Sequence, residues 1–81
     1  MRVRVLLFAG IREAVGAGSL DLEVRRGETA GGVWASLVAS HPRLDGLGAS
    51  TRFARNGEIV TAAAPLVEGD ELAVMPPFGG G

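Results

Sequence analysis

The chain has 81 residues, of which 47% are hydrophobic, and its formal net charge is −1. This length suits one small domain with a packed core, and charges so evenly balanced give no support to nucleic-acid binding. No cysteine occurs, so neither a disulfide nor a thiolate metal site can stabilise the fold. The apolar run Val5–Ala9 is too short for a signal sequence or a membrane span. We therefore expect a cytoplasmic protein that binds neither nucleic acid nor a membrane.

All eight basic side chains are arginines, because the sequence contains no lysine. A compositional bias of the genome can explain this pattern. It also has a chemical consequence, since an amine attacks an activated acyl group and a guanidinium does not. The chain itself therefore contains almost no amine that could attack an activated acyl group.

Two strands are predicted near the start. Arg2–Phe8 begins with strict alternation and then becomes apolar on both faces, while Ser19–Val24 alternates throughout. Residues 9–18 contain three glycines and predict a loop with about one helical turn. The two strands, joined by this short segment, favour an antiparallel pair. The face of the first strand that we expect to point toward a helix carries Val3, Val5 and Leu7.

A single main helix follows, from an N-cap at Thr29 to about Ser40. Gly31 and Gly32 are expected to weaken its first turn by about 1 kcal/mol each relative to alanine. The helix should end at His41, because the residue before a proline is disfavoured in the α region. The apolar stripe that would face the sheet consists of Ala30, Val33, Trp34, Leu37 and Val38.

The remaining strands come after a polar connection over residues 42–51. Arg52–Arg55 and Glu58–Thr61 flank Asn56-Gly57, a strong hairpin signal. The last predicted strand is Glu71–Met75, with Leu72 and Val74 on one face.

This order of elements predicts an α+β fold in which one main helix packs on a mixed sheet. It is the β-grasp arrangement of ubiquitin, with the first and last strands parallel and adjacent at the centre of the sheet. We expect the β-grasp domain to span residues 1–75 and a flexible glycine-rich tail to span 76–81.

The tail, Pro76-Pro77-Phe78-Gly79-Gly80-Gly81, is the most distinctive segment. The prolines end sheet pairing, and glycines are unhindered by a Cβ. Its last four residues can reach about 13–14 Å if extended, enough to enter a narrow channel in another protein. A frayed terminus without function is the alternative.

Side chains offer little catalytic chemistry. His41, the one histidine, is expected to cap the helix C-terminus, and Ser36 and Ser40 have no His–Asp partners nearby in the sequence. The carboxylates show no metal-ligand spacing, so no metal site is expected. Arg12 and Glu13 suggest either a structural ion pair or a contact with a partner.

Apolar side chains are also predicted on the face of the sheet away from the helix. They are Leu6, Phe8, Ala73 and Met75, and they should gather near the start of the tail. Such a patch suggests a protein partner, with Phe78 as an anchor; the alternative is that residues 9–18 fold back over it.

Three segments resemble the small subunit of molybdopterin synthase, a ubiquitin-like sulfur carrier. Phe8–Gly16 resembles its FAxxRExxG opening, and Pro65–Ala73 resembles its PLxDGDEVA stretch. Met75–Gly81 resembles its PPVxGG end, with Phe78 in place of the usual valine. The resemblance covers the chain from Arg2 to Gly81 without a large insertion.

The resemblance implies that Gly81 is the reactive residue and Gly80 the second glycine of the motif. An E1-like enzyme would adenylate the terminal carboxylate with ATP, and a sulfur donor would convert it to a thiocarboxylate. The sulfur would then pass to cyclic pyranopterin monophosphate in the large synthase subunit, within a heterotetramer. No cofactor would be bound permanently. The interface with the large subunit would include Phe8, Met75, Pro76, Pro77, Phe78 and Gly79.

Other functions remain open. Related carriers serve thiamine, cysteine or tRNA thiolation, and ubiquitin-like modifiers also end in Gly-Gly; Asn56–Val60 resembles the thiamine carrier. A β-grasp binding module with an inert tail is a further alternative. An enzyme that acts alone finds no support in the side chains.

Overall fold

The computed structural model describes residues 1–47 and 51–76. The first half contains strand β1 (Arg2–Leu7), helix α1 (Ala9–Val15), strand β2 (Ser19–Glu23), helix α2 (Ala30–Ser40) and the short 3₁₀ helix η1 (Pro42–Leu44). The second half contains strands β3 (Arg52–Arg55), β4 (Glu58–Val60) and β5 (Glu71–Met75). No helix in these two described ranges is long and apolar enough to cross a membrane.

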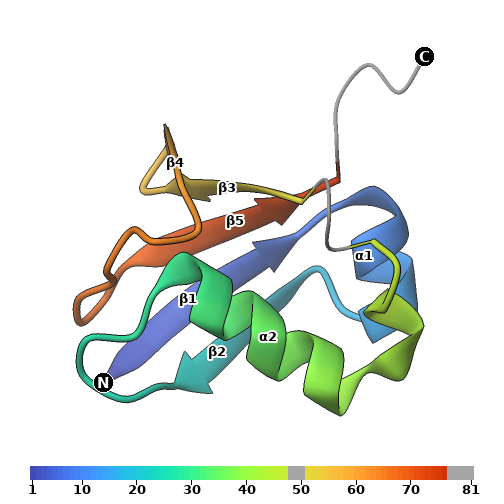
Figure 1. Ribbon diagram of the computed structural model, residues 1–81, viewed down its shortest axis with the longest axis horizontal. Coiled ribbons are helices and arrows are strands. Elements are labelled where there is room, and N and C mark those ends of the chain that lie inside the picture. The colour runs from blue at the N-terminus through green and yellow to red at the C-terminus, as the bar shows by residue number, and fades with distance from the viewer. Residues whose placement is uncertain (48–50, 77–81) are drawn as a thin grey trace.

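The five strands form one mixed sheet in the order β2-β1-β5-β3-β4. The central pair, β1 and β5, is parallel, and the three other pairs are antiparallel. Helix α2 lies across one face of the sheet (Figure 1). The predicted β-grasp fold, with the first and last strands adjacent at the centre, is therefore confirmed.

The core lies between α2 and the face of the sheet that it covers. Side chains alternate between the two faces of a strand, so every second residue of the central strands reaches this layer. Full burial of such an aliphatic side chain contributes about 1.5–3 kcal/mol. The central-strand residues expected to face the helix, Val3, Val5, Leu7, Leu72 and Val74, are all at most 2% exposed.

Helix α2 begins and ends as the sequence predicted. The Thr29 side chain accepts a hydrogen bond from the backbone N–H of Gly32 at 3.0 Å, which satisfies one free donor of the first turn. At the other end the His41 backbone N–H donates to the Leu37 carbonyl at 2.8 Å, and the imidazole Nδ1 lies 3.3 Å from the same oxygen. His41 is therefore a capping residue of the helix.

The two glycines of the first turn have a packing role that the sequence did not reveal. A Cβ on Gly31 would lie 3.0 Å from the Ala62 Cβ and 3.1 Å from the Ala62 carbonyl oxygen. A Cβ on Gly32 would overlap the carboxylate of Glu28, which also accepts a hydrogen bond from the Thr29 N–H. The expectation that these glycines only weaken the helix was incomplete, because they let the chain approach its neighbours closely.

The segment expected to be a loop with one helical turn is instead helix α1. Ile11 on this helix is fully buried, and Gly16 ends it with a positive φ of 87° while its N–H bonds to the Arg12 carbonyl at 2.8 Å. The predicted helical turn is present but longer than expected, because burial of one apolar side stabilises a helix that has no side-chain cap at its start.

A second departure lies in the connection after α2. Leu44, within a segment predicted to be polar and irregular, is fully buried in the core. Pro42 starts the 3₁₀ turn that directs this side chain inward. Tertiary packing determined this position, because a lone leucine among polar residues carries no periodic signal.

The β3–β4 hairpin turns at Asn56 and Gly57, whose φ values are 51° and 87°. The Asn56 amide donates to Asp70 Oδ1 at 2.9 Å and accepts from the Glu71 N–H at 3.0 Å. Asp70 is only 6% exposed, and its second oxygen accepts from the Val67 N–H at 2.8 Å. This network joins the hairpin turn to the start of β5.

Candidate functional site

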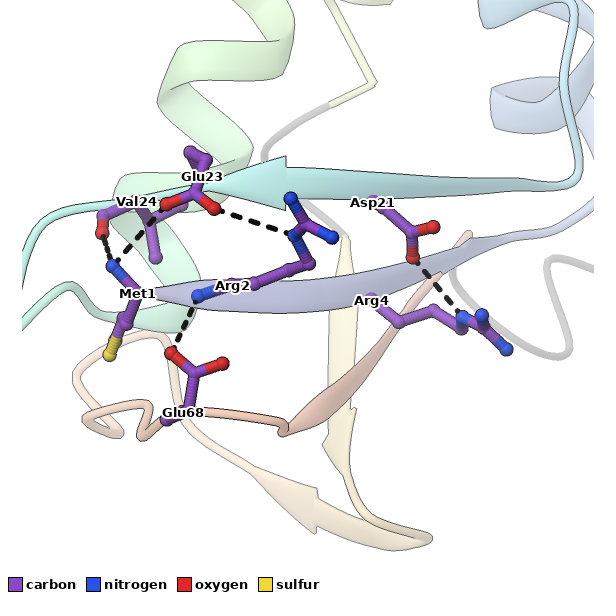
Figure 2. A network of polar contacts seen from close by, with 7 residues as sticks. All are labelled: Met1, Arg2, Arg4, Asp21, Glu23, Val24 and Glu68. Carbon is purple, nitrogen blue, oxygen red and sulfur yellow. Dashed lines mark hydrogen bonds and ion pairs between the residues drawn. The ribbon is translucent and has the colours of Figure 1, made fainter.

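The face of the sheet opposite α2 divides into a charged half and an apolar half. In the charged half, near the start of β1, the Arg2 guanidinium lies 3.4 Å from Glu23, and that of Arg4 lies 3.3 Å from Asp21 (Figure 2). The backbone N–H of Arg2 also donates to the Glu68 carboxylate at 2.9 Å. These side chains are well exposed, so each pair contributes at most about 1 kcal/mol.

The apolar half lies toward the ends of β1 and β5. The strand register aligns one row of side chains across all five strands in the order Ser19, Leu6, Ala73, Ala54 and Ile59. Ile59 is 66% exposed, and Leu6 and Ala73 are half-buried. The row is uncharged, in contrast to the neighbouring row of Asp21, Arg4 and Glu71.

A second row stands one step closer to the tail. Met75, half-buried, pairs with Arg52, and Phe8 follows the end of β1 with 44% of its surface exposed. We call the side chains of Leu6, Phe8, Ala54, Ile59, Ala73 and Met75 the apolar face. It lies beside the residue where β5 ends and the tail begins.

The structure places three of the predicted interface residues. Phe8 directly follows β1, Met75 is the last residue of β5, and Pro76 comes next in the chain. The remaining predicted residues, Pro77, Phe78, Gly79, Gly80 and Gly81, lie outside the described residues. Ile11 of residues 9–18 packs into the core, and Phe8 beside this segment keeps 44% of its surface exposed, which argues against the alternative that residues 9–18 cover the apolar face.

Ile59 belongs to the apolar face but was missed as a partner-binding candidate, and Ala54, only 8% exposed, lies next to it in the same row. Both could have been found from the hairpin signal at Asn56-Gly57. A two-residue turn fixes the register of its strands, so Ile59 must lie opposite Ala54, on the same face as Ala73.

The described residues contain no group of three or more His, Cys, Asp or Glu side chains placed to hold a metal ion. Arg12 and Glu13 take part in none of the ion pairs of this part of the chain. The Arg12 guanidinium instead lies over Gly18, where a Cβ would contact its Nε at 3.4 Å. Of the two alternatives for Arg12 and Glu13, the structural ion pair is not found among the described residues.

Comparison with known proteins agrees with this architecture. The model of the ThiS family matches residues 5–81. The chain belongs to the ThiS family. It is 36% identical, over the full length of both chains, to a molybdopterin synthase sulfur carrier subunit of Chlamydomonas reinhardtii. This similarity confirms the resemblance found in the sequence motifs.

Further similar proteins extend the comparison. The small archaeal modifier protein 1 of Haloferax volcanii is 32% identical over 93% of this chain and 95% of its own. The crystal structure of SAMP1 from the same organism matches all of both chains with a TM-score of 0.83 and 30% identity. A complex of subunits 1 and 2 of molybdopterin-converting factor from Helicobacter pylori contains the same fold, with a TM-score of 0.68, 20% identity and full coverage of both chains.

Proposed function

We propose that this chain is a sulfur carrier for molybdopterin synthesis, with the sulfur held as a thiocarboxylate on Gly81. The observation that carries the proposal is the position of the apolar face beside the start of a tail that ends in Gly79-Gly80-Gly81. Full-length similarity to proteins named as molybdopterin synthase sulfur carrier subunits supports it.

The chemistry requires little from the domain itself. A carboxylate is a poor electrophile, so an E1-like enzyme would first use ATP to form the acyl adenylate. A sulfur donor would then displace AMP and leave the thiocarboxylate. Glycine at position 81 presents no side chain to hinder attack on the carbonyl carbon or passage through a narrow channel. The domain contributes recognition, and the tail carries the cargo.

The partner would be a large synthase subunit that covers the apolar face and receives the tail. Apolar side chains gathered on one face of a small domain, two of them exposed (Phe8 and Ile59) and three half-buried, are typical of a docking surface. Phe8 and Met75 would contact this subunit, and Pro76, Pro77, Phe78 and Gly79 would lead into its channel. Sulfur would then pass to cyclic pyranopterin monophosphate.

Deletion of Gly80 and Gly81 tests the carrier function. The truncated protein should fold normally, because the described domain ends before these residues, but it should lose all sulfur transfer. Mass spectrometry of the full chain, isolated from cells that make the cofactor, should show an increase of about 16 Da when oxygen is replaced by sulfur. Transfer that survives the deletion contradicts the proposal.

A second candidate function is attachment to other proteins as a modifier. Full-length similarity to the small archaeal modifier protein of Haloferax volcanii favours it. The same activated terminus would then form an amide with an amine of another protein. Conjugates that retain the Gly81 carbonyl, identified by peptide sequencing, would establish this function; their absence from cells that make the thiocarboxylate would exclude it.

A further inference from the structure

The activated terminus that both functions require is an electrophile attached to a protein surface. Any nucleophile of the same chain within reach competes with the intended acceptor. We infer that arginine at position 52, in a chain without lysine, protects the tail from capture by its own domain. This inference rests on the proposed function, in which Gly81 bears the activated carboxyl group.

Arg52 occupies the critical position. It lies opposite Met75 in the antiparallel β3–β5 ladder, and its side chain projects from the same face as Met75. Residues paired in this way have Cα atoms about 4.5–5.5 Å apart. Six residues lead from Met75 to Gly81, so the terminal carbonyl carbon can reach at most about 20–22 Å from Met75. The exposed end of residue 52 is well inside this radius.

A lysine at this position would be a competent nucleophile. Its neutral amine would attack the terminal carbonyl carbon, and a C–N bond would form as the bond from carbon to the leaving group breaks. The leaving group, AMP or a thiolate, departs with the bonding electrons, and the amine releases a proton to water. The product is a ring closed by an amide, which has lost its carrier function for good.

Arginine avoids this reaction while keeping the positive charge. The nitrogen lone pairs of a guanidinium are delocalised over its plane, so the group is a poor nucleophile. The other seven basic side chains are arginines too, and no thiol is present.

The amine of Met1 is kept from the tail in a different way. It donates a hydrogen bond to the Val24 carbonyl at 2.7 Å and lies 3.6 Å from the Glu23 carboxylate (Figure 2). Because β1 runs parallel to β5, Met1 lies at the opposite end of the sheet from the start of the tail. Neither kind of amine is therefore placed to attack the activated carbonyl: residue 52 carries a guanidinium instead of an amine, and the amine of Met1 is held at the far end of the sheet.

The test uses the 81-residue chain prepared with an aryl thioester at Gly81, so that no activating enzyme is needed. Wild type is compared with Arg52→Lys, with Arg52→Gln, and with the matched control Arg26→Lys. Arg26 is exposed and lies beside Met1, at the far end of the molecule. At pH about 8.5, roughly 1% of lysine amines are neutral and reactive. Mass spectrometry distinguishes the hydrolysed chain from the cyclic product, which is lighter by one water.

Arg52→Lys should cyclise roughly tenfold faster than Arg26→Lys, because a nearby tether gives a high effective concentration. Wild type and Arg52→Gln, in which the amine of Met1 is the one amine and is hydrogen-bonded to Val24, should cyclise at least tenfold more slowly than Arg52→Lys. The difference between the two lysine variants should disappear in denaturant, and hydroxylamine should react equally with every form. Circular dichroism confirms that each variant is folded.

Three results would overturn the inference: cyclisation of wild type at the rate of Arg52→Lys, no cyclisation of Arg52→Lys, or equal rates for the two lysine variants. Because the thioester is installed chemically, these results are independent of whether a cell activates Gly81. Adenylation of the unmodified chain by an E1-like enzyme tests the proposed function separately.

Discussion

A substitution at Ile59 can change binding to a partner without changing the stability of the domain, because the side chain is exposed. It is 66% exposed and occupies the outer end of the row that crosses the whole sheet. Val67 is similarly apolar and 62% exposed, but it precedes β5 at the other end of the molecule, beside Met1. The two residues therefore form a natural pair for comparison.

We predict that Ile59→Glu weakens binding to the large synthase subunit on the order of tenfold, because a buried contact would become a desolvated charge. Both Ile59→Glu and the control Val67→Glu should change the free energy of unfolding by no more than about 0.5 kcal/mol, since both positions are exposed. Titration calorimetry and urea denaturation measure the two quantities. Equal loss of binding in both variants would show that the apolar face has no special part.

At the scale of elements, the two helices differ in how clearly the sequence predicts them. Helix α2 has an N-cap, an apolar stripe over several turns and a proline after its end, so local signals agree. Helix α1 covers only Ala9–Val15, too short for a stable isolated helix, and burial of Ile11 determines it. Leu44 was missed for the same reason. Repeating apolar positions and caps predicted the long helix α2. The burial of single residues such as Ile11 and Leu44 depends on tertiary packing, which leaves no repeating pattern in the sequence.

Gly31 provides a prediction at this scale. Alanine is favoured over glycine in a helix by about 1 kcal/mol, yet a Cβ here would press against the backbone of Ala62. Overpacking costs about 1–3 kcal/mol, and a cost of about 2 kcal/mol less the helix gain of about 1 kcal/mol leaves a net loss. We therefore predict that Gly31→Ala lowers the free energy of unfolding by about 1 kcal/mol. Urea denaturation measures this change. A more stable variant would mean that residue 62 moves aside at no cost.

Across the whole molecule, the sheet separates a charged end from the end where the tail begins. Alternation along each strand predicted most of the apolar face, including Leu6 and Met75, because side chains two residues apart share a face. To place Ile59 on this face, the pairing between strands is needed as well. The hairpin signal gives the pairing of Ile59 with Ala54, and the pairing of Ala54 with Ala73 must then be added. The roles proposed for Gly80 and Gly81 rest on the family resemblance and not on packing.

The division of the sheet predicts that the charged half takes no part in docking. Arg4→Ala removes the pair with Asp21, in which both side chains are more than half exposed. The free energy of unfolding should fall by less than about 1 kcal/mol, and affinity for the large subunit should stay within about twofold of wild type. Thermal denaturation and calorimetry test both statements. A large loss of affinity would extend the docking surface to the start of β1.

The central place of β5 has a mechanical consequence. This strand is hydrogen-bonded along both edges, to β1 and to β3, and the tail continues directly from it. A force on the tail therefore acts along the strand, across hydrogen bonds that lie at a steep angle to it. The hydrogen bonds of both ladders bear such a load together, in shear. A strand at the edge of the sheet, by contrast, could be pulled away one hydrogen bond at a time. In the proposed function, this arrangement lets the tail be drawn out of the channel of the partner without unfolding the domain.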